Sequence, residues 1–138
     1  MKNNDQHHCS NFLFIDDDPL NNLICRMTIQ VVLGKIDSQS FTNPKLGLEY
    51  LQSSFLTDNH SAHTVLLLDI NMPVMSGWEF LEGFDNLPSQ IKDTITIYIL
   101  SSSVDERDKE RSYANKNVKA FLVKPLTKET VMQMFNGQ

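Results

Sequence analysis

Short apolar segments alternate along this chain with segments of helical periodicity, and this alternation constrains the fold more than any other feature. Four segments are largely apolar or β-branched and too short for helices: residues 12–15, 65–68, 95–100 and 118–123. Residues 36–41 are a weaker strand prediction that rests mainly on position. Strands that alternate with helices form βαβ units with right-handed crossovers. The sequence therefore predicts five strands and five helices in a doubly wound α/β domain with a parallel sheet.

The predicted helices have apolar faces and residues typical of helix ends. In the first helix, one apolar stripe is expected to face the sheet: Leu20, Leu23, Ile24, Met27 and Val31. Gly34 is predicted to end this helix, and Pro44 to lie in the first turn of the second. A helix with Trp78, Phe80, Leu81 and Phe84 follows, and two more are expected over about 105–115 and 128–135.

The length of the chain, 138 residues, fits one domain. Residues 1–10 are polar and are predicted to form a frayed tail, and the polar run 57–63 is predicted to be a loop. The pair His7-His8 is not expected to bind metal, because adjacent residues do not share a helix face. Residues 11–138 are predicted to form the domain, which leaves nothing after the last helix to serve as an output domain.

Charge and cysteine usage narrow the class of protein further. The formal net charge of -5 and the absence of a basic stripe argue against nucleic acid binding. The two cysteines, Cys9 and Cys25, are expected to be free thiols in a reducing compartment. No apolar run is long enough to span a membrane, and the start of the chain lacks the apolar core of a signal peptide. We therefore expect a cytoplasmic protein without a membrane partner.

Residues that can carry chemistry follow four of the predicted strands. Asp16 and Asp17 follow the first strand, Asp69 the third, Ser101 the fourth and Lys124 the fifth. Ligands of an open parallel sheet bind beyond the carboxyl ends of its strands, so these side chains are expected to meet at one edge. Three carboxylates crowded together repel one another, and a divalent cation with a preference for oxygen ligands, such as Mg²⁺, removes that penalty.

Such a set suits phosphoryl transfer, which needs mainly positioning and neutralisation of charge. Once a cation neutralises the acids, one carboxylate can attack a phosphoryl group and become an acyl phosphate. The ammonium of Lys124 can pair with phosphoryl oxygens, and the hydroxyl of Ser101 can donate to another. The strand ends thus predict a magnesium-assisted phosphoryl site.

Four strings surround these residues: Phe14-Ile15-Asp16-Asp17-Asp18-Pro19, Leu68-Asp69-Ile70-Asn71-Met72-Pro73 with Ser76-Gly77, Leu100-Ser101-Ser102-Ser103 and Val123-Lys124-Pro125. Together they resemble the receiver domains of bacterial two-component response regulators, over about residues 11–136. The resemblance implies a flavodoxin-like sheet with the strand order 2-1-3-4-5. It also implies that the chain takes a phosphoryl group from a histidine kinase or a histidine phosphotransfer protein and signals to a downstream protein. Such a protein is not an enzyme and promotes only its own phosphorylation and dephosphorylation.

The resemblance also implies a role for each residue of the acidic pocket. Asp69 would be the phosphoacceptor. Asp16, Asp17 and Asp69 would hold Mg²⁺, one of the first two through water, and Asn71 would supply its backbone carbonyl. Asp18, the third acid of its run, is expected to cap the first helix rather than to bind the metal.

A second group of residues would respond to the phosphoryl group. Ser101 matches the switch hydroxyl, with Ser102 as the alternative register because three serines follow one another. Phe121 matches the switch aromatic, although it lacks the phenolic hydroxyl that could make a hydrogen bond. Lys124 matches the phosphate-sensing lysine, and the peptide bond before Pro125 would be cis, an isomer that is accessible mainly before proline. Without the resemblance Phe121 would be interpreted as a core aromatic, and Trp78, Met72 and Met75 are interpreted as packing residues.

Three other functions remain open at this point. A phosphatase of the haloacid-dehalogenase type also uses a strand-end Asp, but it carries a second Asp where this chain has Asn71. A degenerate receiver that acts as a constitutive interaction module would not need the intact acids and Lys124. A flavodoxin-like cofactor binder needs a phosphate loop after the first strand, where acids stand instead and would repel phosphate.

Overall fold

The computed structural model of the protein describes residues 10–57 and 63–136. Residues 1–9 of the predicted tail, which include Cys9 and the His7-His8 pair, and most of the predicted loop lie outside the described residues, whereas Ser10 begins the first strand. The strands are β1 (Ser10–Ile15), β2 (Asp37–Phe41), β3 (His63–Leu68), β4 (Ile95–Ser101) and β5 (Val118–Val123). The helices are α2 (Pro19–Leu33), α3 (Pro44–Thr57), α4 (Gly77–Asp85), α5 (Ser89–Lys92), α6 (Glu106–Ala114) and α7 (Lys128–Asn136).

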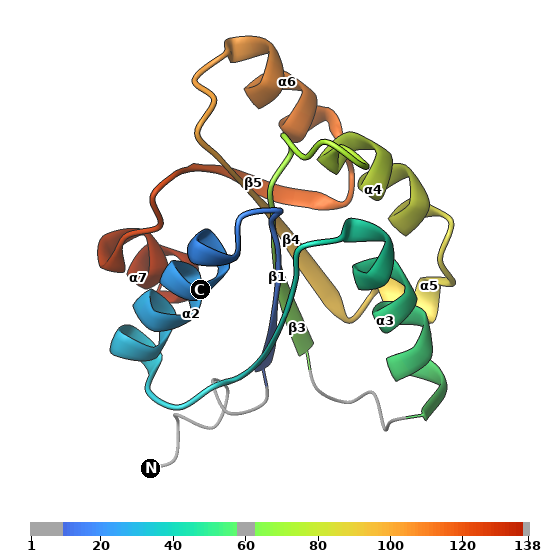
Figure 1. The fold of residues 1–138 in the computed structure, drawn as a ribbon, viewed down its shortest axis with the longest axis horizontal. Coiled ribbons are helices and arrows are strands. Elements are labelled where there is room, and N and C mark those ends of the chain that lie inside the picture. The colour runs from blue at the N-terminus through green and yellow to red at the C-terminus, as the bar shows by residue number, and fades with distance from the viewer. Residues whose placement is uncertain (1–9, 58–62, 137–138) are drawn as a thin grey trace.

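The five strands form one sheet in the order β2-β1-β3-β4-β5. Every neighbouring pair is parallel, and helices cover both faces of the sheet (Figure 1). This is the doubly wound, flavodoxin-like arrangement, so the predicted fold class and strand order are confirmed. Because all strands run in the same direction, their carboxyl ends lie at one edge, which is the upper edge in Figure 1.

Alternate residues of the strands enter two separate cores. Leu13 and Ile15 of β1 belong to the core beneath α3, α4 and α5, whereas Phe12 and Phe14 belong to the core beneath α2 and α7. All four side chains are buried. A strand that is buried on both faces needs an apolar residue at every position, which explains the continuous apolar runs in the sequence.

The number of helices differs from the prediction, because the described residues contain six rather than five. The additional helix, α5, has only four residues and follows Pro88. A single turn is too short to display an apolar periodicity, so the sequence pattern could not reveal it. Its Ile91 is buried in the core beneath α3 and α4, which fixes this turn in place.

The orientation predicted for the first helix is wrong. Four of the five residues expected to face the sheet are exposed and form a surface row on α2 that we call the α2 stripe: Leu20, Leu23, Met27 and Val31. The residues of α2 that are buried are Asn22, Cys25 and Ile29. This second row also has helical spacing; its Cys25 and Ile29 enter the core, and its Asn22 donates a hydrogen bond to the backbone oxygen of Asp16 at the end of β1. A count of apolar residues alone favours the row that is exposed in the structure.

Several predicted helix ends agree with the structure. Asp18 caps α2, because its side chain accepts a hydrogen bond from the Leu20 N–H. Gly34 follows the last residue of α2 with a φ of 86°, a left-handed conformation that favours glycine. Pro44 begins α3. Asp18, the third acid of the run after β1, therefore caps the helix, whereas Asp16 and Asp17 do not.

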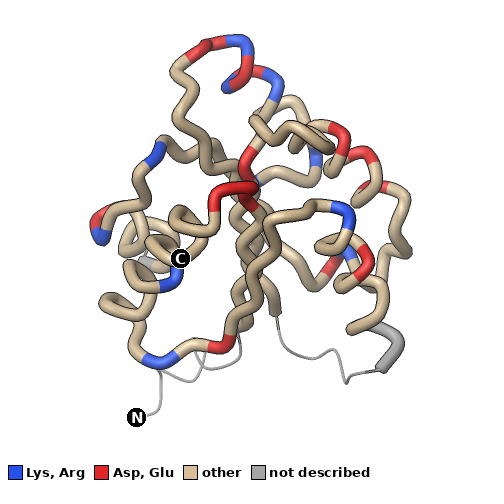
Figure 2. Tube along the Cα trace, in the orientation of Figure 1, with Lys and Arg blue, Asp and Glu red and all other residues tan. Residues whose placement is uncertain are grey.

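Charged residues are dispersed over the described surface. The Lys and Arg positions in Figure 2 are scattered, whereas an acidic segment lies at the centre of the edge where β1 ends. Among the described residues, none of the helices has both the length and the apolar character that crossing a membrane requires.

Candidate functional site

Three carboxylates meet at the carboxyl edge of the sheet. Asp16 and Asp17 follow β1, and Asp69 follows the adjacent strand β3. One oxygen from each lies within 4.8 Å of the other two. Asp16 and Asp69 are buried, whereas Asp17 is exposed. The sequence predicted that these acids meet, and the parallel order of β1 and β3 brings them together.

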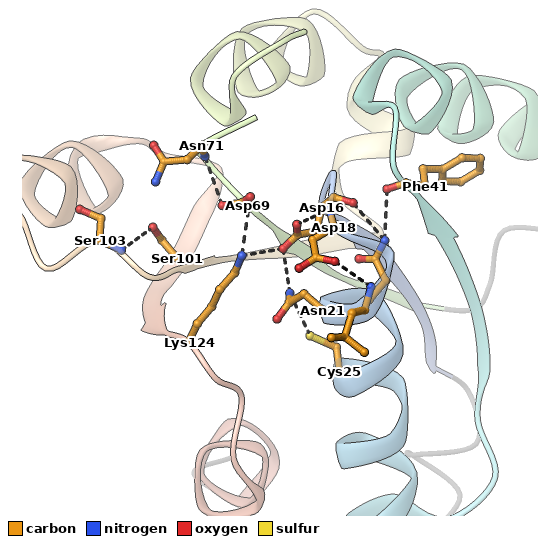
Figure 3. A network of polar contacts seen from close by, with 12 residues as sticks. Asp16, Asp18, Asn21, Cys25, Phe41, Asp69, Asn71, Ser101, Ser103 and Lys124 are labelled. Atoms are coloured by element: carbon orange, nitrogen blue, oxygen red, sulfur yellow. Dashed lines mark hydrogen bonds and ion pairs between the residues drawn. The ribbon is translucent and has the colours of Figure 1, made fainter. Parts of the chain in front are cut away.

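The carboxylate of Asp16 is held by three donors (Figure 3). It accepts hydrogen bonds from the Asp18 N–H at 2.9 Å and from Asn21 Nδ2 at 2.8 Å. The ammonium of Lys124 lies 2.7 Å from its Oδ2. A buried carboxylate with three donors is well compensated for the loss of water, so Asp16 is an anchored charge.

The carboxylate of Asp69 has weaker contacts. Its Oδ1 accepts a hydrogen bond from the Asn71 N–H at 3.2 Å, and its Oδ2 lies 3.7 Å from Lys124 Nζ. Burial raises the pKa of Asp69; the Asn71 N–H opposes this shift, and the charge of Asp16 adds to it. Asp69 is therefore a buried acid whose charge the described protein only partly compensates.

Lys124 bridges the two buried acids from the end of β5. Burial alone would lower the pKa of Lys124, but the hydrogen bond to Asp16 and the charges of Asp69 and Asp16 outweigh it, so the pKa is raised. The ammonium is therefore charged at neutral pH. The Lys124–Pro125 peptide bond is cis, the isomer expected from the resemblance.

Two asparagines of α2 support the site, and the sequence analysis did not single them out. Asn21 donates to Asp16, and Asn22 is buried and donates from Nδ2 to the backbone oxygens of Asp16 and Phe41. Asn22 thus ties the end of β1 to the end of β2. The available signal was the placement of two amides in the first turn of the helix that follows the acids.

The loop after β3 is fixed by a close backbone approach at Gly77. A Cβ atom at this position would lie 2.6 Å from Ile70 Cα and 2.7 Å from the Asp69 carbonyl oxygen. Both are backbone atoms that cannot move aside, so only glycine fits here. The preceding Ser76 caps α4 in a reciprocal capping box with Glu79. The start of α4 is thereby fixed against the strand that carries Asp69.

The first two serines of the triplet differ in burial. Ser101 ends β4 and is fully buried, whereas Ser102 is exposed. The Ser101 hydroxyl is turned toward Ser103 (Figure 3) and accepts a hydrogen bond from the Ser103 N–H at 3.0 Å. Ser103 Oγ in turn donates to Asp108 of α6 at 2.8 Å. The buried position of Ser101 favours it over Ser102 as the predicted switch hydroxyl.

Phe121 lies in β5 and is buried in the core beneath α3 and α4. Its backbone N–H donates to the hydroxyl of Tyr113, a residue of α6, at 3.5 Å. Tyr113 was not among the predicted site residues. It supplies a phenolic hydroxyl near the position where the chain has Phe121, and it comes from α6 rather than from β5.

The arrangement is suited to bind a hard cation and an anionic group together. Carboxylate oxygens are the ligands that Mg²⁺ prefers, and the ion usually takes one or two of them with water and a phosphate oxygen. Lys124 places a positive charge next to Asp69, where it can pair with added phosphoryl oxygens. The geometry thus provides a nucleophilic oxygen, an oxygen-rich cation site and an ammonium.

Comparison with known proteins defines the class of this protein. Residues 12–136 match the family model of the response regulator receiver domain. The match covers most of the chain, so the chain belongs to the response regulator receiver domain family and its context is two-component signalling. Members of this family are generally not classical enzymes. The comparison with curated proteins gave no match.

Solved structures agree with this assignment. A two-component response regulator from Cytophaga hutchinsonii is 27% identical, with a TM-score of 0.83 over 94% of this chain and 96% of that one. A response regulator receiver protein from Dyadobacter fermentans is 23% identical, with a TM-score of 0.81 over 93% of this chain and 96% of that one. A two-component response regulator from Legionella pneumophila has 24% identity and a TM-score of 0.74, covering 91% and 95%. The fold of this chain is similar to all three.

Proposed function

We propose that this protein is a phosphoacceptor response regulator that accepts a phosphoryl group on Asp69 from a histidine kinase or a histidine phosphotransfer protein. One observation carries the proposal. Three carboxylates lie within 4.8 Å of one another, and Asp69, the buried member with the weaker contacts, has the Lys124 ammonium 3.7 Å away. An incompletely compensated carboxylate beside a positive charge is suited to act as a nucleophile toward phosphate.

The residues present fit a bound Mg²⁺ ion. Asp16, Asp17 and Asp69 offer only oxygen ligands, and the proposed set is completed by the backbone carbonyl of Asn71. The raised pKa of Asp69 supports this fit, because burial and the charge of Asp16 penalise its ionised form, and a cation relieves that penalty. When bound, the ion would neutralise charge on the acids and on the phosphoryl oxygens.

The protein's own side chains account for the transfer. A carboxylate oxygen of Asp69 attacks the phosphorus of phosphohistidine, and the P–N bond breaks with its electron pair passing to the imidazole. Lys124 pairs with a phosphoryl oxygen of the acyl phosphate. Ser101 exchanges its contact with Ser103 for a hydrogen bond to another phosphoryl oxygen. Phe121 then turns toward the space that Ser101 leaves, and the changed surface of α6, β5 and α7 is presented to a protein partner.

The acceptor assignment is tested by labelling with acetyl phosphate and Mg²⁺, a small donor that needs no partner. Asp69→Ala is expected to abolish labelling. The matched control is Asp37→Ala, which removes an exposed acid at the start of β2 and is expected to label as the wild type does. Full labelling of Asp69→Ala would refute the assignment. Continuous release of phosphate from unrelated phosphate esters would instead favour the phosphatase alternative.

The α2 stripe supports a protein as the physiological donor. Its first residue, Leu20, lies two residues after the acid run, and the row of exposed apolar side chains extends from there along α2. An apolar row beside a charged site suits a helical partner that presents a histidine to Asp69. A panel of phosphorylated kinases and phosphotransfer proteins from the source genome would identify the fastest donor to Asp69.

With that donor, the double substitution Leu23→Ser and Met27→Ser is expected to slow transfer while labelling by acetyl phosphate stays unchanged. Leu46→Ser removes an exposed apolar side chain from α3 and serves as the control. Unchanged transfer to the double variant would show that the donor docks elsewhere.

A further inference from the structure

Helix α6 has no apolar face with which to pack against the rest of the protein. Its sequence is polar and charged, and Ser112 is the only buried residue among its nine. In the view of Figure 1 it lies at the top, next to α4 and beyond the carboxyl edge of the sheet. Because burial of apolar area contributes little here, a few polar contacts decide where this helix sits.

One of these contacts joins α6 to α4. The guanidinium carbon of Arg111 lies 4.4 Å from the centroid of the Trp78 ring, within the range of a cation–π interaction. Within the described part of the chain, Arg111 has no ion-pair partner that competes for its charge. Trp78 follows Gly77, whose backbone abuts the Asp69 carbonyl oxygen. Arg111 therefore ties α6 to a segment that is fixed against the phosphoacceptor strand.

A second contact joins α6 to the loop after β4. Asp108 accepts a hydrogen bond from Ser103 Oγ, and the Ser103 N–H donates to the Ser101 hydroxyl. Asp108 and Arg111 are three residues apart on the helix, so they project from neighbouring positions on one side. Helix α6 is thus attached to the proposed switch serine at one point and to the start of α4 at another.

We infer that the Arg111–Trp78 contact is a latch that holds α6 in its unphosphorylated position and sets how readily the protein switches. This inference rests on the proposed function and names a regulation of that site. When Ser101 turns to the phosphoryl group, its contact with Ser103 is lost, and the attachment of α6 through Asp108 changes with it. The contact with Trp78 then opposes the movement of α6. Arg111 is a positioning residue, since it acts through α6 and does not touch the phosphoryl group.

The test uses beryllofluoride with Mg²⁺ as a mimic of the acyl phosphate, and it follows the fluorescence of Trp78, the only tryptophan of the chain. Removal of an exposed cation–π contact is expected to lower the half-saturating beryllofluoride concentration, measured by calorimetry, about two- to fivefold in Arg111→Gln. The fluorescence change on binding should be largely lost, because the guanidinium no longer leaves the ring. Lys109→Gln removes one positive charge from the same helix and should behave as the wild type does.

A double-mutant cycle separates the latch from a general effect on folding. In a Trp78→Leu background, calorimetry should show that Arg111→Gln no longer changes beryllofluoride affinity, because its partner is absent. Equal affinities for Arg111→Gln and Lys109→Gln, weaker binding by Arg111→Gln, or an undiminished effect in the Trp78→Leu background would overturn the latch alone. Failure of the wild-type protein to bind beryllofluoride would overturn the proposed function and the latch with it.

Discussion

Buried acids follow β1 and β3 side by side, yet the two acids differ in the number of their donors and in the distances to them. Asp16, after β1, accepts from a backbone N–H, an amide and the Lys124 ammonium at 2.7–2.9 Å. Asp69, after β3, has one backbone donor at 3.2 Å and the same ammonium at 3.7 Å. Helix α2 supplies the amide donor to Asp16, whereas the loop after β3 supplies the Asn71 N–H to Asp69.

This difference separates anchoring from reactivity. An acid surrounded by strong donors is stabilised as a carboxylate and is a poor candidate for bond formation. An acid with few donors retains a free oxygen and gains most from a cation or from neutralisation. The end of β1 is therefore expected to hold the site together, and the end of β3 to react.

Among the residues that support Asp69, the largest effect is expected when Asp16 loses its charge. Asp16→Asn removes a proposed Mg²⁺ ligand and leaves Lys124 without its shortest ion pair, so labelling by acetyl phosphate should slow about 100-fold. Asp18→Asn is the control, since asparagine also caps helices and Asp18 is not a proposed ligand. Labelling time courses check both variants. Equal rates for Asp16→Asn and wild type would remove Asp16 from the metal site.

The backbone at the end of β3 is expected to tolerate no side chain at Gly77. Gly77→Ala forces a Cβ onto the backbone of Ile70 and Asp69 and should cost about 2–3 kcal/mol in the free energy of unfolding. Gly83→Ala in the same helix meets the end of the Leu48 side chain at 2.8 Å, which can turn aside, so its effect should stay within about 1 kcal/mol. Urea denaturation measures both. Similar losses in the two variants would show that the close approach is not what fixes this loop.

Neutralising the reactive acid should stabilise the fold. The pKa of Asp69 is raised in the folded state, so its ionisation favours unfolding, and Asp69→Asn should raise the melting temperature by a few degrees at pH 7 without Mg²⁺. This gain is full above the folded pKa of Asp69, shrinks as the pH falls below it, and vanishes below the unfolded value of about 3.9. Asp16→Asn should instead destabilise by about 1–3 kcal/mol, because it leaves donors unpaired. If thermal melts show that the melting temperatures of Asp69→Asn and Asp16→Asn shift in the same direction, the proposed division between an anchoring and a reactive acid is contradicted.

The smallest effect is expected from the amide that supports Asp16. Asn21→Ala removes one hydrogen bond to the carboxylate and should cost about 1 kcal/mol in the free energy of unfolding. Labelling by acetyl phosphate should stay within about threefold of the wild-type rate, since Lys124 and the Asp18 N–H remain. A loss as large as that of Asp16→Asn would mean that Asn21 belongs to the reactive site itself.

The sheet and its acidic edge were predictable because they depend on local signals. A strand that is apolar at every position must be buried on both faces, as Phe12 and Leu13 show. Parallel strands deliver their carboxyl ends to one edge, so the expectation that Asp16 and Asp69 meet there follows from the direction of the strands. The resemblance, rather than the pattern, supplied the strand order and the individual roles.

Other features depend on contacts that no local pattern records. The face of α2 was mispredicted because two rows with helical spacing compete, and the inward row contains Asn22, which an apolar count disfavours. Helix α5 is a single turn set by Pro88 and the burial of Ile91. The contact between Trp78 and Arg111 joins two helices and is visible only once both are placed.

The most direct test of the account is to locate the phosphoryl group after incubation with acetyl phosphate. Peptide mass spectrometry of the wild-type protein should place it on Asp69, and only when Mg²⁺ is present, because the crowded acids need a cation to accept a further anion. A phosphoryl group on the Ser101–Ser103 triplet or on Asp16, or equal labelling of Asp69 with the metal chelated, would contradict the account.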